Sequence, residues 1–211
     1  GAAKTPNIDR IAREGVQFRT CFAPAICGPS RALLMTGVYA NRSGAFRNDI
    51  WAFDSRGTLF TRQHSWAKLL RQGGYATAAA GKWHCSAKEA WEPEVGFEEY
   101  CMYEGPDKIK GHFGIDVIAQ GLRKDVKLPD VRYWYSSMVQ NGKYVPVTES
   151  DFGPDQRCEF LMDFMERKTK AGKPFMAYWP TVIPHGPYST TPDAGEAMDI
   201  ELKKPDVKGM S

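Results

Sequence analysis

The chain has 211 residues, of which 42% are hydrophobic and 25% charged, and its formal net charge is +3. These values are typical of a globular protein long enough for one domain with a substantial core. The basic residues are dispersed, so composition gives no case for nucleic acid as a partner. The apolar runs are too short to predict a membrane segment, and the first residues do not read as a signal peptide.

Five cysteines stand at positions 21, 27, 85, 101 and 158. None of them forms a Cys-x-x-Cys pair, which argues against a zinc ribbon or a thioredoxin-like site. Their odd number leaves at least one thiol without an intramolecular partner. Most are expected to be small buried hydrophobic residues, and the pattern does not indicate a cellular compartment.

The chain opens with a helix signal. Thr5 and Pro6 suit the first turn of a helix that Gly15 ends. The alternating run over 16–22 predicts a strand, and a second helix is predicted over 29–37. Helix and strand therefore alternate from the start.

The next segment repeats this alternation. A third helix is predicted over 65–72, and the pair Gly73-Gly74 ends it. A strand rich in small residues follows over 75–80. The side of the helix expected to be buried carries Trp66, Leu69 and Leu70.

The middle of the chain is the least regular part. Residues 86–130 show no sustained period, so we expect loops inserted around the core. Two strands are predicted over 132–139 and 143–147, because Asn141-Gly142 between them is a strong hairpin turn signal.

The last elements return to the α/β pattern. A helix is predicted over 156–170 and an apolar strand over 174–181. Alternating strands and helices indicate an α/β fold with a largely parallel sheet. The side of this helix expected to be buried carries Phe160, Leu161, Phe164 and Met165.

Three stretches with reactive side chains follow predicted strands, at residues 27–31, 81–84 and 184–187. Catalytic residues of α/β domains lie in the loops beyond the carboxyl ends of their strands. Cys27 also lies just ahead of a predicted helix, where backbone N–H groups favour negative charge and raise the reactivity of a thiol. Arg31, one turn further on, is placed to hold an anion beside it. Taken alone, however, a cysteine in this position is more often a buried structural residue beside a surface arginine.

The string around Cys27 is more specific than the single residue. Cys27-Gly28-Pro29-Ser30-Arg31, followed by Leu34-Met35-Thr36-Gly37, resembles the C-x-P-S-R signature of type I sulfatases. Four specified positions occur by chance on the order of once in a thousand chains of this length.

Three further stretches resemble the same family in the same order, from residue 5 to about 188. The segment from Thr5 to Val16 resembles its T-P-N helix. Residues 81–84 match its G-K-W-H motif, and His185 lies in its H-x-P motif after Lys173-Pro174-Phe175. The resemblance implies an alkaline phosphatase-like fold with helices on both faces of the sheet.

The resemblance also implies a mechanism. In the family the motif cysteine is oxidised to formylglycine, whose aldehyde hydrate attacks a sulfate ester and then releases sulfate. Carried over, Arg31 and Lys82 hold the hydrate and the sulfate oxygens. His84 takes the proton of the second hydroxyl, and His185 assists the leaving alcohol. Residues 29–31 resemble the recognition element of the formylglycine-generating enzyme.

The family requires a divalent cation, usually Ca²⁺. Its acidic ligands precede the T-P-N helix and follow the H-x-P motif, so this sequence offers only Cys27, as formylglycine, for that role. We therefore expect residues 1–211 to be part of a sulfatase catalytic domain, incomplete at both ends. Its expected parts are the nucleophile-bearing core at 1–85, an insertion of loops and a hairpin at 86–150, a core helix and strand at 151–188, and a loop at 189–211.

The substrate implied by the family is a sulfate monoester, as a small molecule or within a carbohydrate. Phosphonate monoester or phosphodiester hydrolysis is the alternative, because some members of the superfamily share the formylglycine motif. A second alternative is a non-catalytic anion-binding homologue, and a cysteine hydrolase using Cys27 and His84 is a third, weaker one. The family resemblance suggests a periplasmic, secreted or lysosomal protein.

Overall fold

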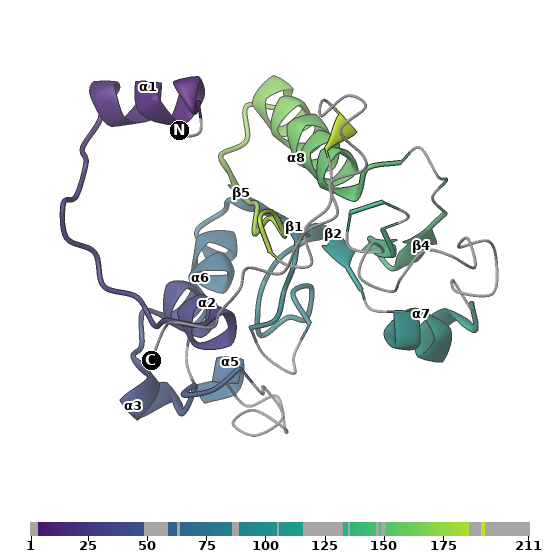
Figure 1. Cartoon of the computed structure of the whole chain (residues 1–211), viewed down its shortest axis with the longest axis horizontal. Coiled ribbons are helices and arrows are strands. Elements are labelled where there is room, and N and C mark those ends of the chain that lie inside the picture. Colours follow the sequence, from purple (N-terminus) through teal and green to yellow (C-terminus); the bar gives the residue numbers. More distant parts are fainter. Residues whose placement is uncertain are drawn as a thin grey trace, which may run out of the picture.

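A five-stranded sheet forms the centre of the protein in this computed structural model (Figure 1). The structure describes residues 4–48, 59–62, 64–85, 89–104, 106–115, 133–134, 136–146, 148, 151–185 and 191–192. The strand order is β4-β3-β2-β1-β5. The strands are β1 (Ala76–Gly81), β2 (Glu99–Tyr103), β3 (Met138–Gln140), β4 (Lys143–Val145) and β5 (Phe175–Tyr178).

The sheet is mixed. β1 pairs in parallel with β2 on one side and with β5 on the other, while β3 and β4 form an antiparallel hairpin against β2. The hairpin turns at Asn141 and Gly142, which both have positive φ, as this turn type requires. The prediction of an α/β fold is confirmed, with its parallel part confined to β2, β1 and β5.

Seven helices are present in the described residues, and two of them cover opposite faces of β1. They are α1 (Pro6–Glu14), α2 (Cys27–Thr36), α3 (Ala40–Ser43), α5 (Leu59–Arg62), α6 (Trp66–Gln72), α7 (Pro106–Phe113) and α8 (Gly153–Lys170). Ala76, Ala78 and Ala80 face α8, whereas Ala79 faces the cluster that contains Ala67 of α6. The small side chains of β1 allow both helices to approach closely. Within the described part of the chain, no helix combines the length and apolar character needed to cross a bilayer.

α8 packs one apolar face on the sheet. Its side chains Phe160, Leu161 and Phe164 are buried with β1 and β2, as predicted from their spacing. Close to its C-terminus, Arg167 and Lys168 bond to the Glu99 carboxylate of β2 at 2.6 and 2.7 Å. These contacts fix α8 along the sheet.

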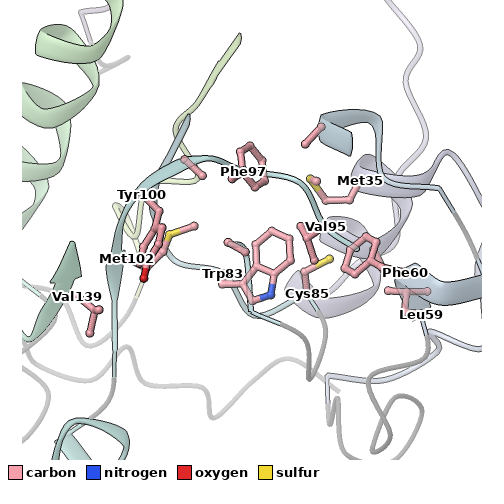
Figure 2. Packing of buried hydrophobic residues seen from close by; sticks show 14 of the residues in the cluster. Met35, Leu59, Phe60, Trp83, Cys85, Val95, Phe97, Tyr100, Met102 and Val139 are labelled. Carbon is pink, nitrogen blue, oxygen red and sulfur yellow. The ribbon is translucent and has the colours of Figure 1, made fainter. Parts of the chain in front are cut away.

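The opposite face carries the larger core cluster, shown in Figure 2. It joins Met35 of α2 and Phe60 of α5 to Phe97 and to Met102 of β2. Trp83, just beyond β1, lies in its middle, with ring centroids 5.8 Å from Phe60 and 6.3 Å from Phe97. This cluster therefore connects the helix that bears Cys27 to the strand end that bears Lys82 and His84.

Several local predictions were wrong. Residues 16–22 form no strand, and Val16, Phe18 and Phe22 are 79 to 80% exposed. β2 and α7 lie within 86–130, where loops were expected. The strand expected over 132–139 begins only at Met138, although residues 132 and 135 lie outside the described residues. In α6 the buried position is Ala67, whereas Leu69 is 51% exposed.

Candidate active site

Cys27 is the first residue of α2, two residues earlier than the sequence predicted the helix to start. Ala32 and Met35 bury one side of α2 in the large core cluster, which fixes the helix against α6 and the end of β1. The thiol is half-buried, and it lies at the positive end of the helix, as expected from its place before Pro29. Ser30 is held nearby by a hydrogen bond from its hydroxyl to the Pro24 carbonyl at 2.6 Å.

The segment after β1 places two polar side chains together. Trp83 and Cys85 are 6% and 1% exposed, so the core anchors every second residue of this stretch. The intervening residues, Lys82 and His84, are only half-buried and lie at the Cys27 thiol. The backbone N–H of Lys82 donates to the Pro180 carbonyl at 2.8 Å, which ties this segment to the chain leaving β5.

Three side chains surround the Cys27 sulfur among the described residues. His84 Nδ1 lies 3.3 Å from it and Lys82 Nζ lies 4.0 Å from it. The thiol also donates to Asn48 Oδ1 at 3.0 Å. The expected grouping of Cys27, Lys82 and His84 is therefore present in the geometry.

Arg31 lies on the same side of α2 and is held by two partners. Its Nη1 donates to the Lys82 carbonyl at 2.7 Å, and it forms a hydrogen bond with the Tyr178 side chain at the end of β5. Burial raises the pKa of Tyr178, and the charge of Arg31 opposes that rise. Tyr178 therefore remains a neutral phenol that fixes the guanidinium.

His185 reaches the site from the loop after β5. Its N–H donates to the Val182 carbonyl at 2.8 Å, and the Tyr133 hydroxyl donates to the His185 carbonyl. The side chain is exposed, and its charge is close enough to act on the His84 ring. Residues 27, 31, 82 and 84 thus form a contacting group, with His185 at its rim.

Burial is the main cause that lowers the pKa of His84 below its ordinary value of 6.5. The cations Lys82 and Arg31 lower it further, and a hydrogen bond to the Asn48 backbone opposes them. At neutral pH the ring is therefore uncharged, which is the state required to accept a proton.

We expect this shift to be measurable by NMR titration of the four histidines, with His84 assigned through a His84→Gln variant. His84 should titrate below 6.5, so that its charge appears only as the pH falls below that value. Lys82→Gln removes one of the repelling cations and should move the His84 pKa upward, whereas Lys4→Gln should leave it unchanged. A His84 pKa above 6.5 would contradict this electrostatic description.

Two contacts of this site were not predicted from the sequence. Asn48 contacts Cys27 across 21 sequence positions, without any local spacing that would signal it. Tyr178 lies in the apolar strand predicted over 174–181, and this pattern assigns it no role at the site. For Tyr178 the available signal was its place at the carboxyl end of a strand, where catalytic groups of α/β domains lie.

No group of three or more His, Cys, Asp or Glu residues in the described ranges is arranged to hold a metal ion. The donors around Cys27 are one amide oxygen, one ammonium and one imidazole. This set does not form a calcium cage, because Ca²⁺ takes six to eight oxygen ligands.

The sequence is similar to a family model and to relatives that all have sulfatase names. The model of the sulfatase family matches residues 1–200. An N-acetylglucosamine-6-O-sulfatase of Bacteroides thetaiotaomicron is 32% identical over 190 residues, covering 90% of this chain and 28% of the relative. An N-acetylgalactosamine-6-sulfatase of Canis lupus familiaris is 30% identical over 207 residues, covering 91% of this chain and 37% of the relative.

A solved structure is similar in fold as well. The PsFucS1 sulfatase from Pseudoalteromonas sp. matches with a TM-score of 0.61 and 25% identity, covering 87% of this chain and 39% of that chain. The present chain therefore spans between 28% and 39% of the length of these three proteins.

Proposed function

This chain belongs to the sulfatase family, and from that premise we propose that it carries the nucleophile of a sulfuric ester hydrolase. The observation that carries the proposal is the meeting of Cys27 with Lys82 and His84. The sulfur lies 3.3 Å from the His84 ring and 4.0 Å from the Lys82 ammonium, although 57 and 55 positions separate these residues in the sequence. A merely structural cysteine needs neither neighbour.

The nucleophile we propose is the hydrate of formylglycine, formed when a formylglycine-generating enzyme oxidises the Cys27 side chain to an aldehyde that adds water. In the structure the Cys27 sulfur stands in for one hydroxyl oxygen of that hydrate. Its surroundings suit a hydroxyl group, because Asn48 Oδ1 accepts a hydrogen bond and Lys82 donates one. The His84 ring nitrogen does either, according to its tautomer.

Two steps then complete the reaction. One hydroxyl oxygen bonds to the sulfur atom of the ester and releases its proton to water, while the bond from sulfur to the alcohol oxygen breaks and that oxygen takes a proton from His185. The second hydroxyl gives its proton to His84 and becomes the aldehyde oxygen, as the bond from carbon to the sulfate oxygen breaks. Sulfate leaves and water restores the hydrate. A sulfated thiol or simple alcohol has no second hydroxyl and no such release.

The cations suit the charge that develops on sulfate. Arg31 is fixed by the Lys82 carbonyl and by Tyr178, so its guanidinium is ordered without a substrate. Preorganised donors of this kind stabilise a transition state because they need not rearrange as charge builds up. Lys82, at the sulfur, supplies a second positive charge.

The proposed substrate is a sulfate monoester carried by a sugar. Two relatives are named for N-acetylglucosamine and N-acetylgalactosamine sulfates, and this supports a carbohydrate. The calcium ion typical of the family would supply further positive charge at residue 27. Because the described residues do not form its cage, we assign no step to it.

The test is the mass of the proteolytic peptide that contains residue 27, taken from the full-length protein expressed with a formylglycine-generating enzyme. We expect a mass lower by the difference between a CH₂SH and a CHO group, together with turnover of an aryl sulfate. The peptide containing Cys21 but not residue 27 serves as the control and should keep its thiol mass. An unmodified residue 27 in a protein that hydrolyses sulfate esters would overturn the proposed nucleophile. Higher kcat/KM for a phosphonate monoester than for the aryl sulfate would overturn the proposed substrate class.

A further inference from the structure

Asn48 makes three contacts at the start of α2. Its Oδ1 accepts from the Gly28 N–H at 2.8 Å and from the Cys27 thiol at 3.0 Å. Its backbone forms a hydrogen bond with the His84 ring. One residue thus contacts the helix end, the nucleophile position and the neighbouring imidazole.

The helix end needs such a partner. The first N–H groups of a helix have no acceptor within the helix, and Ile26 at the N-cap position has an apolar side chain that accepts nothing. Asn48 supplies the missing acceptor from outside the helix. The bond from the Gly28 N–H also fixes the amide orientation, because only an oxygen can accept there.

The chain is shaped to bring Asn48 to this place. α3 ends at Ser43, and its C-cap residue Gly44 has a φ of 82°, which lets the chain reverse. Ala45 is then buried in the core cluster. At the other side, a Cβ on residue 28 would lie 3.1 Å from Asn48 Oδ1 and 3.5 Å from the Arg47 carbonyl oxygen. The absence of a side chain at Gly28 therefore permits the close approach.

Among the described residues, three side chains contact the sulfur of residue 27, and they differ in whether they donate or accept hydrogen bonds. Lys82 only donates hydrogen bonds, and His84 donates or accepts, whereas Asn48 Oδ1 only accepts. An aldehyde at residue 27 has no donor for Asn48, whereas each hydroxyl of the hydrate has one. Asn48 therefore discriminates between these two states of the side chain.

We propose that Asn48 is a positioning residue that holds the formylglycine side chain as its hydrate and orients one hydroxyl beside His84. This inference rests on the proposed conversion of Cys27, and it adds a residue that the sequence motifs do not contain. In this role Asn48 acts on the reaction through residue 27. Its loss should therefore lower kcat and leave KM nearly unchanged.

The experiment uses the full-length, converted protein labelled with ¹³C at residue 27, in which NMR resolves the aldehyde carbon from the hydrate carbon. In Asn48→Leu, which keeps the size and removes the acceptor, the ratio of hydrate to aldehyde should fall about fivefold, as expected for the loss of one hydrogen bond. kcat should fall by a similar or larger factor. Asn41→Ala, at an exposed asparagine of α3, should change neither quantity.

Asn48→Asp separates positioning from a general loss of structure. The carboxylate keeps the acceptor, so the hydrate ratio should return to the wild-type value, while KM for the anionic ester should rise through charge repulsion. A hydrate ratio in Asn48→Leu equal to that of the wild type would overturn the inference, as would a ratio in Asn48→Asp as low as that in Asn48→Leu. The mass of residue 27 is measured in each variant. A wild-type protein without conversion would refute the proposed function itself, whereas conversion with an unchanged hydrate ratio would refute only the role of Asn48.

Discussion

Replacing Cys27 with alanine is expected to lower turnover of a sulfate ester by roughly 10⁴-fold or more, because it removes the proposed nucleophile. Alanine keeps the helix start, so the folded structure should remain. The measurement is kcat/KM for an aryl sulfate in the full-length protein, with circular dichroism to confirm the fold.

Cys21→Ala is the matched control for this variant. Cys21 is exposed and lies outside the contacts of the site, so its replacement should leave kcat/KM within about twofold of the wild type. Substantial turnover by Cys27→Ala would show that the reaction proceeds without residue 27, and the proposed mechanism would be wrong.

Replacing Gly81 with alanine is the second change with a large expected effect, and it acts on stability. Gly81 has a φ of 141°, and a Cβ at this position would lie 2.3 Å from the Pro180 carbonyl oxygen. The Cβ is attached to the backbone of β1 and the oxygen belongs to the backbone of Pro180, so relieving the clash requires the backbone to shift. The free energy of unfolding should fall by about 2–4 kcal/mol, from the strain of the backbone together with the clash.

The same substitution should also disturb the site, because Gly81 directly precedes Lys82.

Chemical denaturation measures the loss of stability in Gly81→Ala, and Gly74→Ala is the control variant. Gly74 also has a positive φ, of 89°, but a Cβ there would meet open space. Its replacement should cost only about 1 kcal/mol, the strain without the clash. Equal losses at both positions would contradict the close approach of Pro180 to β1.

The grouping of Cys27, Lys82 and His84 was predictable in two ways, from their expected place beyond strand ends and, more specifically, from the order of the family motifs. The first argument fails for Cys27, because residues 16–22 ahead of it form no strand. Local physical reasoning identified a helix start and a strand end, but it contained nothing that sets the distance between them. That distance depends on the core cluster around Trp83, which residues from many segments assemble. The domain boundaries proposed from the sequence stay a prediction.

Two misread segments show why local patterns are insufficient. Residues 16–22 alternate as a strand does, but within the described residues they find no neighbouring strand to pair with. β2 is the reverse case, a strand without alternation. Its middle residues are buried on both faces of the sheet, so polar and apolar positions do not alternate along it. Asn48 was missed for a related reason: its partners are 20 and 21 positions away, and no periodicity relates them.

The long separations within this site have a consequence for the timing of synthesis. Cys27 leaves the ribosome 57 residues before His84, and at 5–20 residues per second this interval is between about 3 and about 11 seconds. β5, which pairs with β1 and positions Arg31 through Tyr178, is made later still. The thiol therefore spends its first seconds in an incomplete chain, before the residues that later enclose it exist. The formylglycine-generating enzyme proposed above would meet Cys27 unenclosed during that interval.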